Sequence, residues 1–311
     1  MTKIKTLIHL LIHPSQMIIF LASNSLMNWL PDAIYLKLMY WANSGKKLNL
    51  KKPVAFTEKM QWLKLHDRQE KYIDYVDKIR VKEYVGRKIG QQFVLPTLGV
   101  WDSFDQIDFD SLPDRFVLKC NHDSGSIVKC KGKATFDFTE AEKKITRRLH
   151  TDAYNWGREW PYKQVKRKVF AEAYLTQNEE SDELIDYKFY CFDGKPEYCQ
   201  VITDRAKDER IDFFDMEWRH QPFVGLTPVI GNSTHALTCP VNYSKMQEFA
   251  TILSKGTPFC RIDFYEAEEK LYFGEITLYP AAGFGRFTPD EWDIILGEKI
   301  KLDNIQDKTA K

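Results

Sequence analysis

Two short apolar segments near the end of the chain most constrain its fold. Only a short polar stretch separates them, so they are expected to pair as neighbouring strands. Residues 258–264 and 271–277 each read as one β-strand of a hairpin, and each strand carries an acidic side chain, Asp263 or Glu275. Arg261 lies two residues before Asp263 and therefore points to the same face. Carboxylates on neighbouring strands can share a hard divalent cation and bridge it to nucleotide phosphates. Taken alone, the pair fits an ordinary hairpin with solvated charges equally well.

A second polar feature interrupts an upstream apolar stretch at residues 116–128. A strand ends near Lys119, a small polar loop follows, and a second strand begins. Backbone N–H groups and hydroxyls of such a loop can approach phosphate, with the lysine as a point charge. The loop has one glycine and is neither a Walker loop nor a dinucleotide fingerprint, so a plain hairpin turn is its alternative.

The remaining pattern predicts an α+β protein rather than a doubly wound parallel sheet, because helices and hairpin strands are segregated along the chain. We find no internal repeat and no low-complexity linker. Helices are expected over 56–63, 76–85, 139–151 and 243–255, with Gly90 ending the second of them. Strands are expected over 94–100, 116–129 with the polar loop inside, 168–175, 185–193, 196–203, 211–215, 259–265 and 271–277.

Composition limits the class of protein and of partner. A chain of 311 residues that is 43% hydrophobic can build a large core, and a formal net charge of +1 gives no general attraction to nucleic acid. We therefore expect no nucleic-acid partner and a small-molecule or saccharide substrate. The six cysteines form no Cys-x-x-Cys pair and no zinc spacing, which favours reduced, cytosolic thiols over a disulfide framework.

The first fifty residues differ from the rest, since they hold five lysines, one aspartate and long apolar stretches. Residues 4–12 and 17–30 are apolar, but 13–16 interrupt them, and neither piece reaches the roughly 20 residues that span a bilayer. A signal peptide is disfavoured because no good cleavage site follows. Two amphipathic helices remain, which either pack on the body as an extra layer or lie in the cytoplasmic membrane interface. The expected location is cytoplasmic, or peripheral at the cytoplasmic face of the inner membrane.

The order of these features resembles the ATP-grasp superfamily, whose members clamp ATP between two α+β subdomains. From about residue 48 to 302 the chain resembles the TupA-like branch, associated with bacterial surface polysaccharide (capsule) biosynthesis. The resemblance is carried by LKLHDR (63–68), LKCNHDSG (118–125), GREWPY (157–162), DYKF (186–189) and GFGRF (283–287). It implies an N-terminal helical segment at 1–50, a catalytic domain at 51–302 with a lid-like subdomain at 116–170, and a tail at 303–311.

The resemblance also implies site residues and two cofactors, ATP and Mg²⁺, with two magnesium ions. Lys119 and Arg261 are the implied catalytic cations, on the nucleotide phosphates and the transferring phosphoryl group. The implied ATP-binding residues, including Glu172 at the adenine amine, are Lys119, Ser124, Gly125, Ser126, Glu172, Tyr174, Leu175, Asp186 and Lys188. The implied metal ligands are Asp263, Glu275 and Thr277. Thr277 stands where superfamily members often carry asparagine, and a hydroxyl is a weaker ligand than an amide carbonyl. The alternatives are solvated strand charges, a surface lysine and an ordinary ion pair of Arg261.

The substrate side has weaker signals, because an anionic sugar needs cationic forks and aromatic platforms that many sequences contain. The candidates are His122, Arg158, Glu159, Trp160, Tyr162, Arg205 and Arg286. We expect His122 to order its loop rather than to act as a general base.

The implied reaction is ATP-dependent carboxylate–amine ligation through an acyl phosphate. Its implied partners are a small amine or amino acid and a uronic-acid-containing saccharide or glycan. Three other functions stay open: a membrane-associated glycosyltransferase with a metal-binding Asp-x-Asp at Asp108 and Asp110, a phosphotransferase with the same ATP residues, and a non-catalytic glycan-binding scaffold.

Overall fold

The computed structural model describes residues 12–176, 184–204, 208–226, 230–267, 269–303 and 305. The α-helices run over Pro14–Ser23 (α2), Asp32–Ser44 (α3), Phe56–His66 (α4), Lys71–Val76 (α5), Arg80–Ile89 (α6), Phe138–Leu149 (α7), Ala153–Gly157 (α8), Tyr243–Ser254 (α9) and Glu291–Glu298 (α10). The strands run over Thr97–Trp101 (β1), Phe116–Cys120 (β2), Val128–Cys130 (β3), Val169–Ala173 (β4), Asp186–Phe192 (β5), Lys195–Thr203 (β6), Arg210–Phe214 (β7), Val224–Gly225 (β8), Phe259–Ala267 (β9), Lys270–Thr277 (β10) and Phe287–Thr288 (β11).

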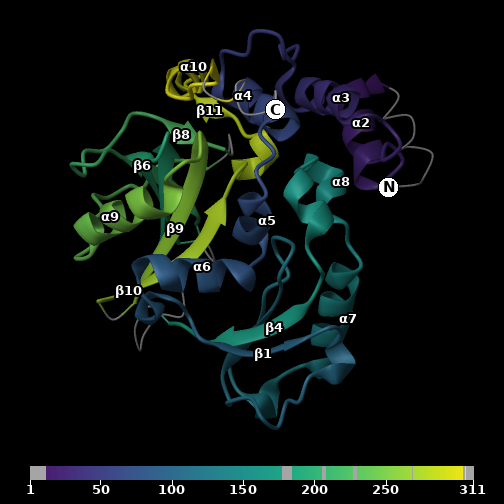
Figure 1. Ribbon diagram of the computed structural model, residues 1–311, viewed down its shortest axis with the longest axis vertical. Coiled ribbons are helices and arrows are strands. Elements are labelled where there is room, and N and C mark those ends of the chain that lie inside the picture. Colours follow the sequence, from purple (N-terminus) through teal and green to yellow (C-terminus); the bar gives the residue numbers. More distant parts are fainter. Residues whose placement is uncertain are drawn as a thin grey trace.

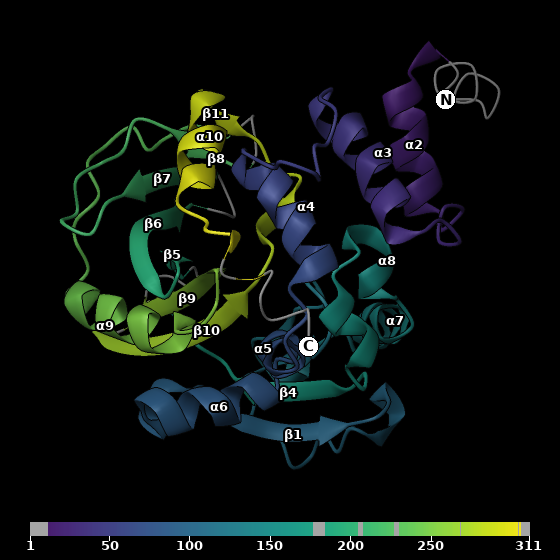
Figure 2. The same cartoon turned by 45° about the horizontal axis from the view of Figure 1, so that its top comes forward.

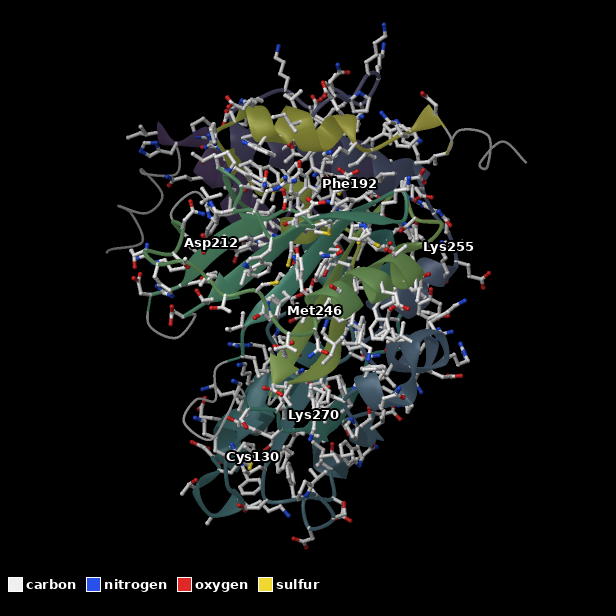
Figure 3. All side chains as sticks on the ribbon, turned by 90° about the vertical axis from the view of Figure 1, so that its left-hand side faces the viewer. Cys130, Phe192, Asp212, Met246, Lys255 and Lys270 are labelled. Carbon is white, nitrogen blue, oxygen red and sulfur yellow. The ribbon has the colours of Figure 1, made fainter. Side chains whose placement is uncertain are left out.

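The larger sheet has five antiparallel strands in the order β10-β9-β5-β6-β7. Its central strand, β5, is buried along its whole length, since both faces of the sheet are covered. Helix α9 packs on one face, where Met246 is fully buried (Figure 3). The α9 face is apolar, so the polar side chains of these strands gather on the opposite face.

The smaller sheet has the order β1-β4-β2-β3, also antiparallel, and forms the lower part of the molecule in Figure 1. Helix α7 covers one face with Ile145 and Leu149, which join a core of their own with Leu118 and Val169. The two sheets therefore have separate apolar cores. Strand alternation turns the other face of the small sheet, with Lys119 and Glu172, away from α7.

Helices α2 and α3 pack side by side and form a third layer. Helix α4 lies between this layer and the large sheet (Figure 2). Tyr35, Leu36 and Met39 of α3 are buried in a small core that includes Phe284 of the body. Large apolar side chains of this layer are nevertheless exposed, among them Trp29 at 79%. In the described residues no helix is both long and apolar enough to cross a membrane.

The expected α+β architecture is confirmed, and so are most of the expected helices and strands of the body, within a few residues at their ends. The helix expected over 76–85 runs over 80–89 instead, because Asp77 accepts from the N–H groups of Ile79 and Arg80 and forms a turn there. Gly90 follows the last residue of α6, as expected. All six cysteines are free. The expected interruption lies at His13, which is outside a helix, and α2 begins directly after it at Pro14, a residue that suits the first turn of a helix. The helix expected over 17–30 begins earlier and ends at Ser23. The expected 4–12 helix lies outside the described residues, apart from residue 12.

A close crossing of α10 over the segment that leads into α4 gives a stability prediction. A Cβ placed on Gly297 would lie 2.1 Å from the carbonyl oxygen of Val54 and 2.7 Å from the backbone nitrogen of Phe56. Gly297→Ala should therefore lower the free energy of unfolding by about 1–3 kcal/mol, because backbone contacts outweigh the gain of roughly 1 kcal/mol in helix propensity. Urea denaturation measures the change, and the exposed neighbour Glu298→Ala is the control. Equal stability of both variants would contradict the close crossing.

Candidate functional site

Strand alternation and register place four charged side chains on the face of the large sheet opposite α9. Arg261 and Asp263 of β9 lie two residues apart, and Cys260, Ile262 and Phe264 between and beside them face the apolar core. Register pairs Asp263 with Lys188 of β5 on one side and with Glu275 of β10 on the other. A bulge between Phe273 and Glu275 adjusts this register.

Asp263 is the centre of this group and has no exposed surface. Arg261 donates to its two carboxylate oxygens at 2.7 Å each, and the ammonium of Lys188 donates to Oδ2 at 2.5 Å. Lys188 also contacts Asp186 at 3.3 Å. Burial raises the pKa of Asp263, and the charges of Arg261 and Lys188 oppose that shift.

Glu275 is the accessible carboxylate of the group, with 35% of its side chain exposed. Its Oε1 accepts from Arg261 Nη2 at 3.0 Å and from the hydroxyl of Thr277 at 3.1 Å, while Lys78 Nζ lies 3.7 Å from Oε2. Burial would raise its pKa, but Lys78, Arg261 and Lys188 hold it well below the usual range. Glu275 is therefore a carboxylate over any physiological pH.

A second charged group faces the large sheet from the small one. Glu172 of β4 is buried and accepts hydrogen bonds from Lys119 of β2 and, at 2.9 Å, from Lys82 of α6. Burial would raise its pKa, but the two lysines lower it below the usual value. Lys82 also lies over the ring of Phe170, 5.2 Å from the centroid. This group links α6 to the small sheet.

The loop between β2 and β3 is held from several sides. Arg148 of α7 donates to Asp123 at 2.5 Å and to the carbonyl of Ser124. The hydroxyl of Ser126 accepts from the backbone N–H of Cys120 at 2.7 Å. Gly125 has φ of +93°, a conformation that glycine adopts without strain. His122 Nε2 lies 3.1 Å from the carbonyl of Thr151, which fits the expected loop-ordering contact.

Together these groups line a cavity of about 400 Å³, which we call the first chamber. Its charged wall contains five cations, Lys78, Lys82, Lys119, Lys188 and Arg261, and four acids, Asp123, Glu172, Glu209 and Glu275. Its apolar wall contains Leu95, Phe170, Ile202, Ile211, Leu226, Ile230 and Phe273. One end therefore suits a flat apolar group, and the other suits an anion with several negative charges.

A second chamber of about 630 Å³ adjoins the first. The residues that line both are Lys78, Asp123, Ser124, Arg261 and Glu275. The second chamber also has an aromatic wall of Tyr75, Trp156, Tyr162 and Tyr279, with Thr277 and Glu159 beside it. Two ligands, one in each chamber, would meet at Arg261 and Glu275.

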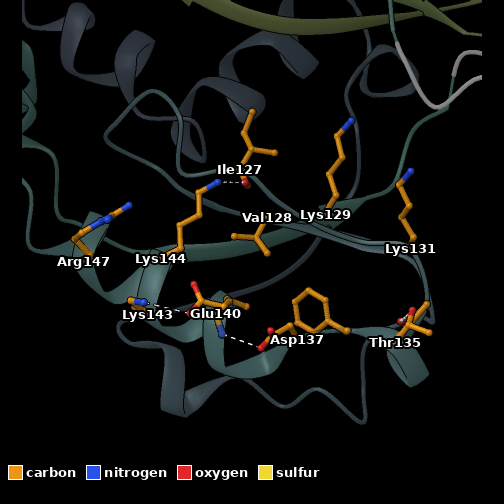
Figure 4. A pocket seen from close by; sticks show the side chains of 13 residues that line it. Ile127, Val128, Lys129, Lys131, Thr135, Asp137, Glu140, Lys143, Lys144 and Arg147 are labelled. Atoms are coloured by element: carbon orange, nitrogen blue, oxygen red, sulfur yellow. Dashed lines mark hydrogen bonds and ion pairs between the residues drawn. The ribbon is translucent and has the colours of Figure 1, made fainter. Parts of the chain in front are cut away.

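A third hollow lies on the small sheet between β3 and α7, and is lined by several exposed cations (Figure 4). The cations around it are Lys129, Lys131, Lys143 and Arg147. Lys144 also lines it and donates to the carbonyl of Ile127 at 2.8 Å. It shares only Ile127 with the first chamber and contains none of the predicted site residues.

The structure brings together most of the residues that the sequence singled out, but not all. Lys119, Ser124, Gly125, Ser126, Glu172, Lys188, Arg261 and Glu275 line the first chamber, and Glu159, Tyr162 and Thr277 line the second. Asp263 and Asp186 lie buried beneath them. Tyr174, Leu175, His122 and Trp160 do not line either chamber.

Two arginines lie elsewhere and one is not described. Arg158 is buried under the N-terminal layer, where it donates to the carbonyls of Met27 and Asn28 at 3.1 and 3.2 Å. Arg286 lies 3.9 Å from Asp290 in a separate hollow. Arg205 lies outside the described residues. Sequence reasoning missed Lys78, Lys82 and Arg148; Lys78 lies in the turn before α6, and Lys82 and Arg148 lie on helices, where isolated basic residues gave no signal.

The donor set near Arg261 fits a magnesium ion that takes its remaining ligands from phosphate and water. Two carboxylates, Asp263 and Glu275, are paired in register, and the hydroxyl of Thr277 lies between Arg261 and Glu275. Among the described residues no group of three or more acidic, histidine or cysteine side chains gathers at one point. The protein thus offers few ligands of its own, as is usual for Mg²⁺ bound with a nucleotide.

A protein-family model described as TupA-like ATPgrasp matches residues 58–301 of the chain. The search of curated proteins found no match to this chain. Several solved structures are distantly similar. D-alanine–D-alanine ligase from Bacillus anthracis complexed with ATP has 14% identity, covers 66% of this chain and 54% of its own, and gives a TM-score of 0.36. The Helicobacter pylori enzyme has 12% identity, shares of 79% and 67%, and a TM-score of 0.42.

The ATP-grasp ligase PsnB, complexed with minimal precursor, Mg and ADP, has 13% identity, shares of 81% and 65%, and a TM-score of 0.39. The chain spans about half to two thirds of the length of these three proteins.

The buried carboxylate of Asp263 gives the prediction of this subsection. Asp263→Asn removes the negative charge that lies between Arg261 and Lys188, and should lower the free energy of unfolding by about 3–5 kcal/mol, since it breaks a buried ion pair. Urea denaturation at neutral pH measures the loss. The exposed Asp105→Asn is the control, with an expected change below about 0.5 kcal/mol. A loss at Asp263 no larger than that of the control would show that its charge is not needed.

Proposed function

Because the chain belongs to the TupA-like ATP-grasp family, we propose that it is an ATP-dependent carboxylate–amine ligase. The observation that carries the proposal is the pair of chambers that share Lys78, Arg261 and Glu275. The first chamber has an apolar end for adenine and a cationic end for phosphates. The second has room for a substrate next to the point where the terminal phosphate would lie.

The proposed reaction has two displacement steps. The substrate carboxylate attacks the γ-phosphorus of ATP, giving an acyl phosphate and releasing ADP. An amine then attacks the acyl carbon, phosphate leaves, and the amine loses a proton. Lys119, Lys188 and Arg261 would neutralise phosphate charge, and holding both reactants in place can supply roughly 7–11 kcal/mol of the barrier.

Magnesium would be held by Glu275, Asp263 and Thr277, and when bound would neutralise phosphate oxygens; we propose two ions. Glu275 is the more available ligand, because the oxygens of Asp263 already accept from Arg261 and Lys188. Lys119 is the proposed phosphate contact of the small sheet, together with the backbone of Ser124, Gly125 and Ser126.

Glu172 is proposed to border adenine, because it lines the first chamber. Tyr174 and Leu175, predicted at adenine, and Asp186, predicted at the ribose, are outside the lining of the chamber, so their roles stay predictions from the sequence. Glu172 is held by two lysines, so only an oxygen lone pair not used by Lys82 and Lys119 could accept from adenine. The proposed domain bounds remain 1–50, 51–302 and 303–311. The proposed lid at 116–170 would extend to β1, which pairs with β4 in the same sheet.

The finer proposal concerns the substrates. The family is associated with surface polysaccharides, and we propose an amine or amino acid as one substrate and a uronic-acid-type carboxylate of a saccharide or glycan as the other. Tyr75, Trp156 and Tyr162 offer the aromatic surfaces on which a sugar ring packs. The protein would act in the cytoplasm on a precursor of the polymer.

The other functions are tested by the same assay. Purified protein is given MgATP with candidate carboxylates and amines, separately and together. Release of ADP and phosphate that needs both a carboxylate and an amine supports the ligase. Release of ADP with a stable phosphorylated product indicates a phosphotransferase instead, and release of UDP or GDP from a nucleotide sugar indicates a glycosyltransferase. The last is disfavoured, because Asp108 caps its own turn through the N–H groups of Asp110 and Ser111.

The proposed metal ligand gives a kinetic prediction. Glu275→Gln keeps the shape of the side chain but removes its charge, so magnesium-dependent ATP turnover should fall by roughly 100-fold or more. The matched control is Glu248→Gln on the exposed side of α9, which should keep full turnover. Circular dichroism checks that both variants are folded. Normal turnover by a folded Glu275→Gln protein would exclude it as a metal ligand.

We also propose peripheral contact with anionic membranes through the N-terminal layer. The support is its exposed apolar side chains, including Phe20, Leu26, Trp29 and Ile34, together with the lysines of the first fifty residues. The same layer packs on Phe284, so the two alternatives for this segment are compatible.

Vesicle flotation tests the membrane proposal. The full chain should float with anionic phosphatidylglycerol vesicles at low salt and less at high salt, because screening weakens the lysine contribution. Trp29→Ser with Leu26→Ser should reduce flotation without changing ATP binding. Absence of the full chain from the lipid fraction at both salt concentrations would refute it.

A further inference from the structure

Glu159 is a carboxylate of the second chamber that accepts no hydrogen bond from the residues that the structure describes. It lies two residues after the end of α8 and lines the chamber. A Cβ placed on Gly157 would lie 2.7 Å from Glu159 Oε1, so the carboxylate lies back over this glycine. A half-buried carboxylate without a donor is costly unless a ligand supplies one.

Lys64 of α4, the cation with the largest electrostatic effect on Glu159, cannot supply that donor. Its ammonium is buried and donates to Gln61 Oε1 at 2.8 Å and to the carbonyls of Gly157 and Ala282 at 2.6 Å each. These three contacts use its three N–H groups. Lys64 therefore balances the charge of Glu159 from a distance but leaves its oxygens open.

The other cations on the chamber wall are also engaged. Arg148 donates to Asp123 and Ser124, and Arg261 donates to Asp263 and Glu275. Lys78 faces Glu275 at 3.7 Å. The aromatic wall beside Glu159 adds ring faces that attract cations. What the chamber wall leaves unsatisfied is a negative charge, and a positively charged ligand group would satisfy it.

We propose that Glu159 receives the ammonium group of the amine substrate in the second chamber; this rests on the ligase function proposed above. The ligand class is a primary ammonium, placed between the carboxylate of Glu159 and the ring of Tyr162 or Trp156. This assigns the amine to the second chamber, on the side of Glu159, and leaves the first chamber to the nucleotide.

The protonation behaviour of Glu159 agrees with this geometry. Burial raises its pKa, the charge of Lys64 opposes that shift and the charge of Glu275 adds to it, so that the pKa of Glu159 lies at about 7. Lys78 opposes the shift. The remaining titratable and charged residues that line the chamber are Tyr75, Asp123, Arg148, Asp152, Tyr162, Arg261 and Tyr279. A bound ammonium would restore the ionised form, because an adjacent positive charge favours the carboxylate.

Glycinamide is a suitable probe, since it carries a primary ammonium and no carboxylate, and acetamide is its uncharged counterpart. Ligand-observed NMR titrations are run on the full chain, with and without MgADP. Wild-type protein should bind glycinamide and not acetamide. Glu159→Gln should weaken glycinamide binding at least about tenfold, because one charge-assisted contact is lost. Glu140→Gln, an exposed acid of α7, should bind as the wild type does.

A second variant covers the case in which Glu159→Gln fails to fold. Gly157→Ala keeps the charge but pushes the carboxylate aside, so it should also weaken glycinamide binding. If a folded Glu159→Gln protein binds glycinamide as tightly as the wild type does, the assignment is overturned. If Glu159→Gln does not fold, equal binding by Gly157→Ala and the wild type overturns it. So would absence of glycinamide binding to wild-type protein. If wild-type protein does not bind MgADP, the proposed nucleotide site in the first chamber is contradicted. The glycinamide titration without nucleotide still tests the role of Glu159.

Discussion

The carboxylate of Asp263 is the constraint on which the rest of the structure depends. An ionised carboxylate without exposed surface is tolerated only when cations and hydrogen bonds compensate it, since uncompensated burial costs several kcal/mol. The compensation comes from Arg261 on the same strand and Lys188 on the neighbouring one. Alternation then directs the intervening side chains of β9 to the apolar core under α9. The same register that compensates Asp263 therefore defines both the site and the core.

The two chambers lie where the large sheet, the small sheet and helix α6 meet. The large sheet presents Arg261, Lys188 and Glu275, and the small sheet presents Lys119 and Glu172 from a separate apolar core. Lys82 of α6 connects them through Glu172. Because one set of residues lines both chambers, a phosphate in the first and an acceptor in the second would be adjacent. That adjacency is what a two-step ligation requires.

Local pattern was enough to predict much of this arrangement. The hairpin of β9 and β10 was readable because its apolar residues alternate with Arg261, Asp263 and Glu275, and β2 was readable from its apolar run before Lys119. Contacts between distant elements were not readable. Nothing near Lys64 in the sequence indicates that its ammonium meets the carbonyls of Gly157 and Ala282, and nothing near Lys82 indicates that it meets Glu172. Arg158 shows the reverse error, since an arginine beside aromatic residues suggested a substrate contact and proved to hold the N-terminal layer.

The central claim is that one nucleotide and its metal lie between Lys119 and Glu275, and a crystal structure of the protein grown with Mn²⁺ and ADP tests it most directly. We expect anomalous scattering from manganese within coordination distance of Glu275, with the ADP phosphates facing Lys119 and the adenine against Phe170 and Ile202. Nucleotide bound at the cationic hollow between β3 and α7, or manganese remote from Glu275, would contradict it.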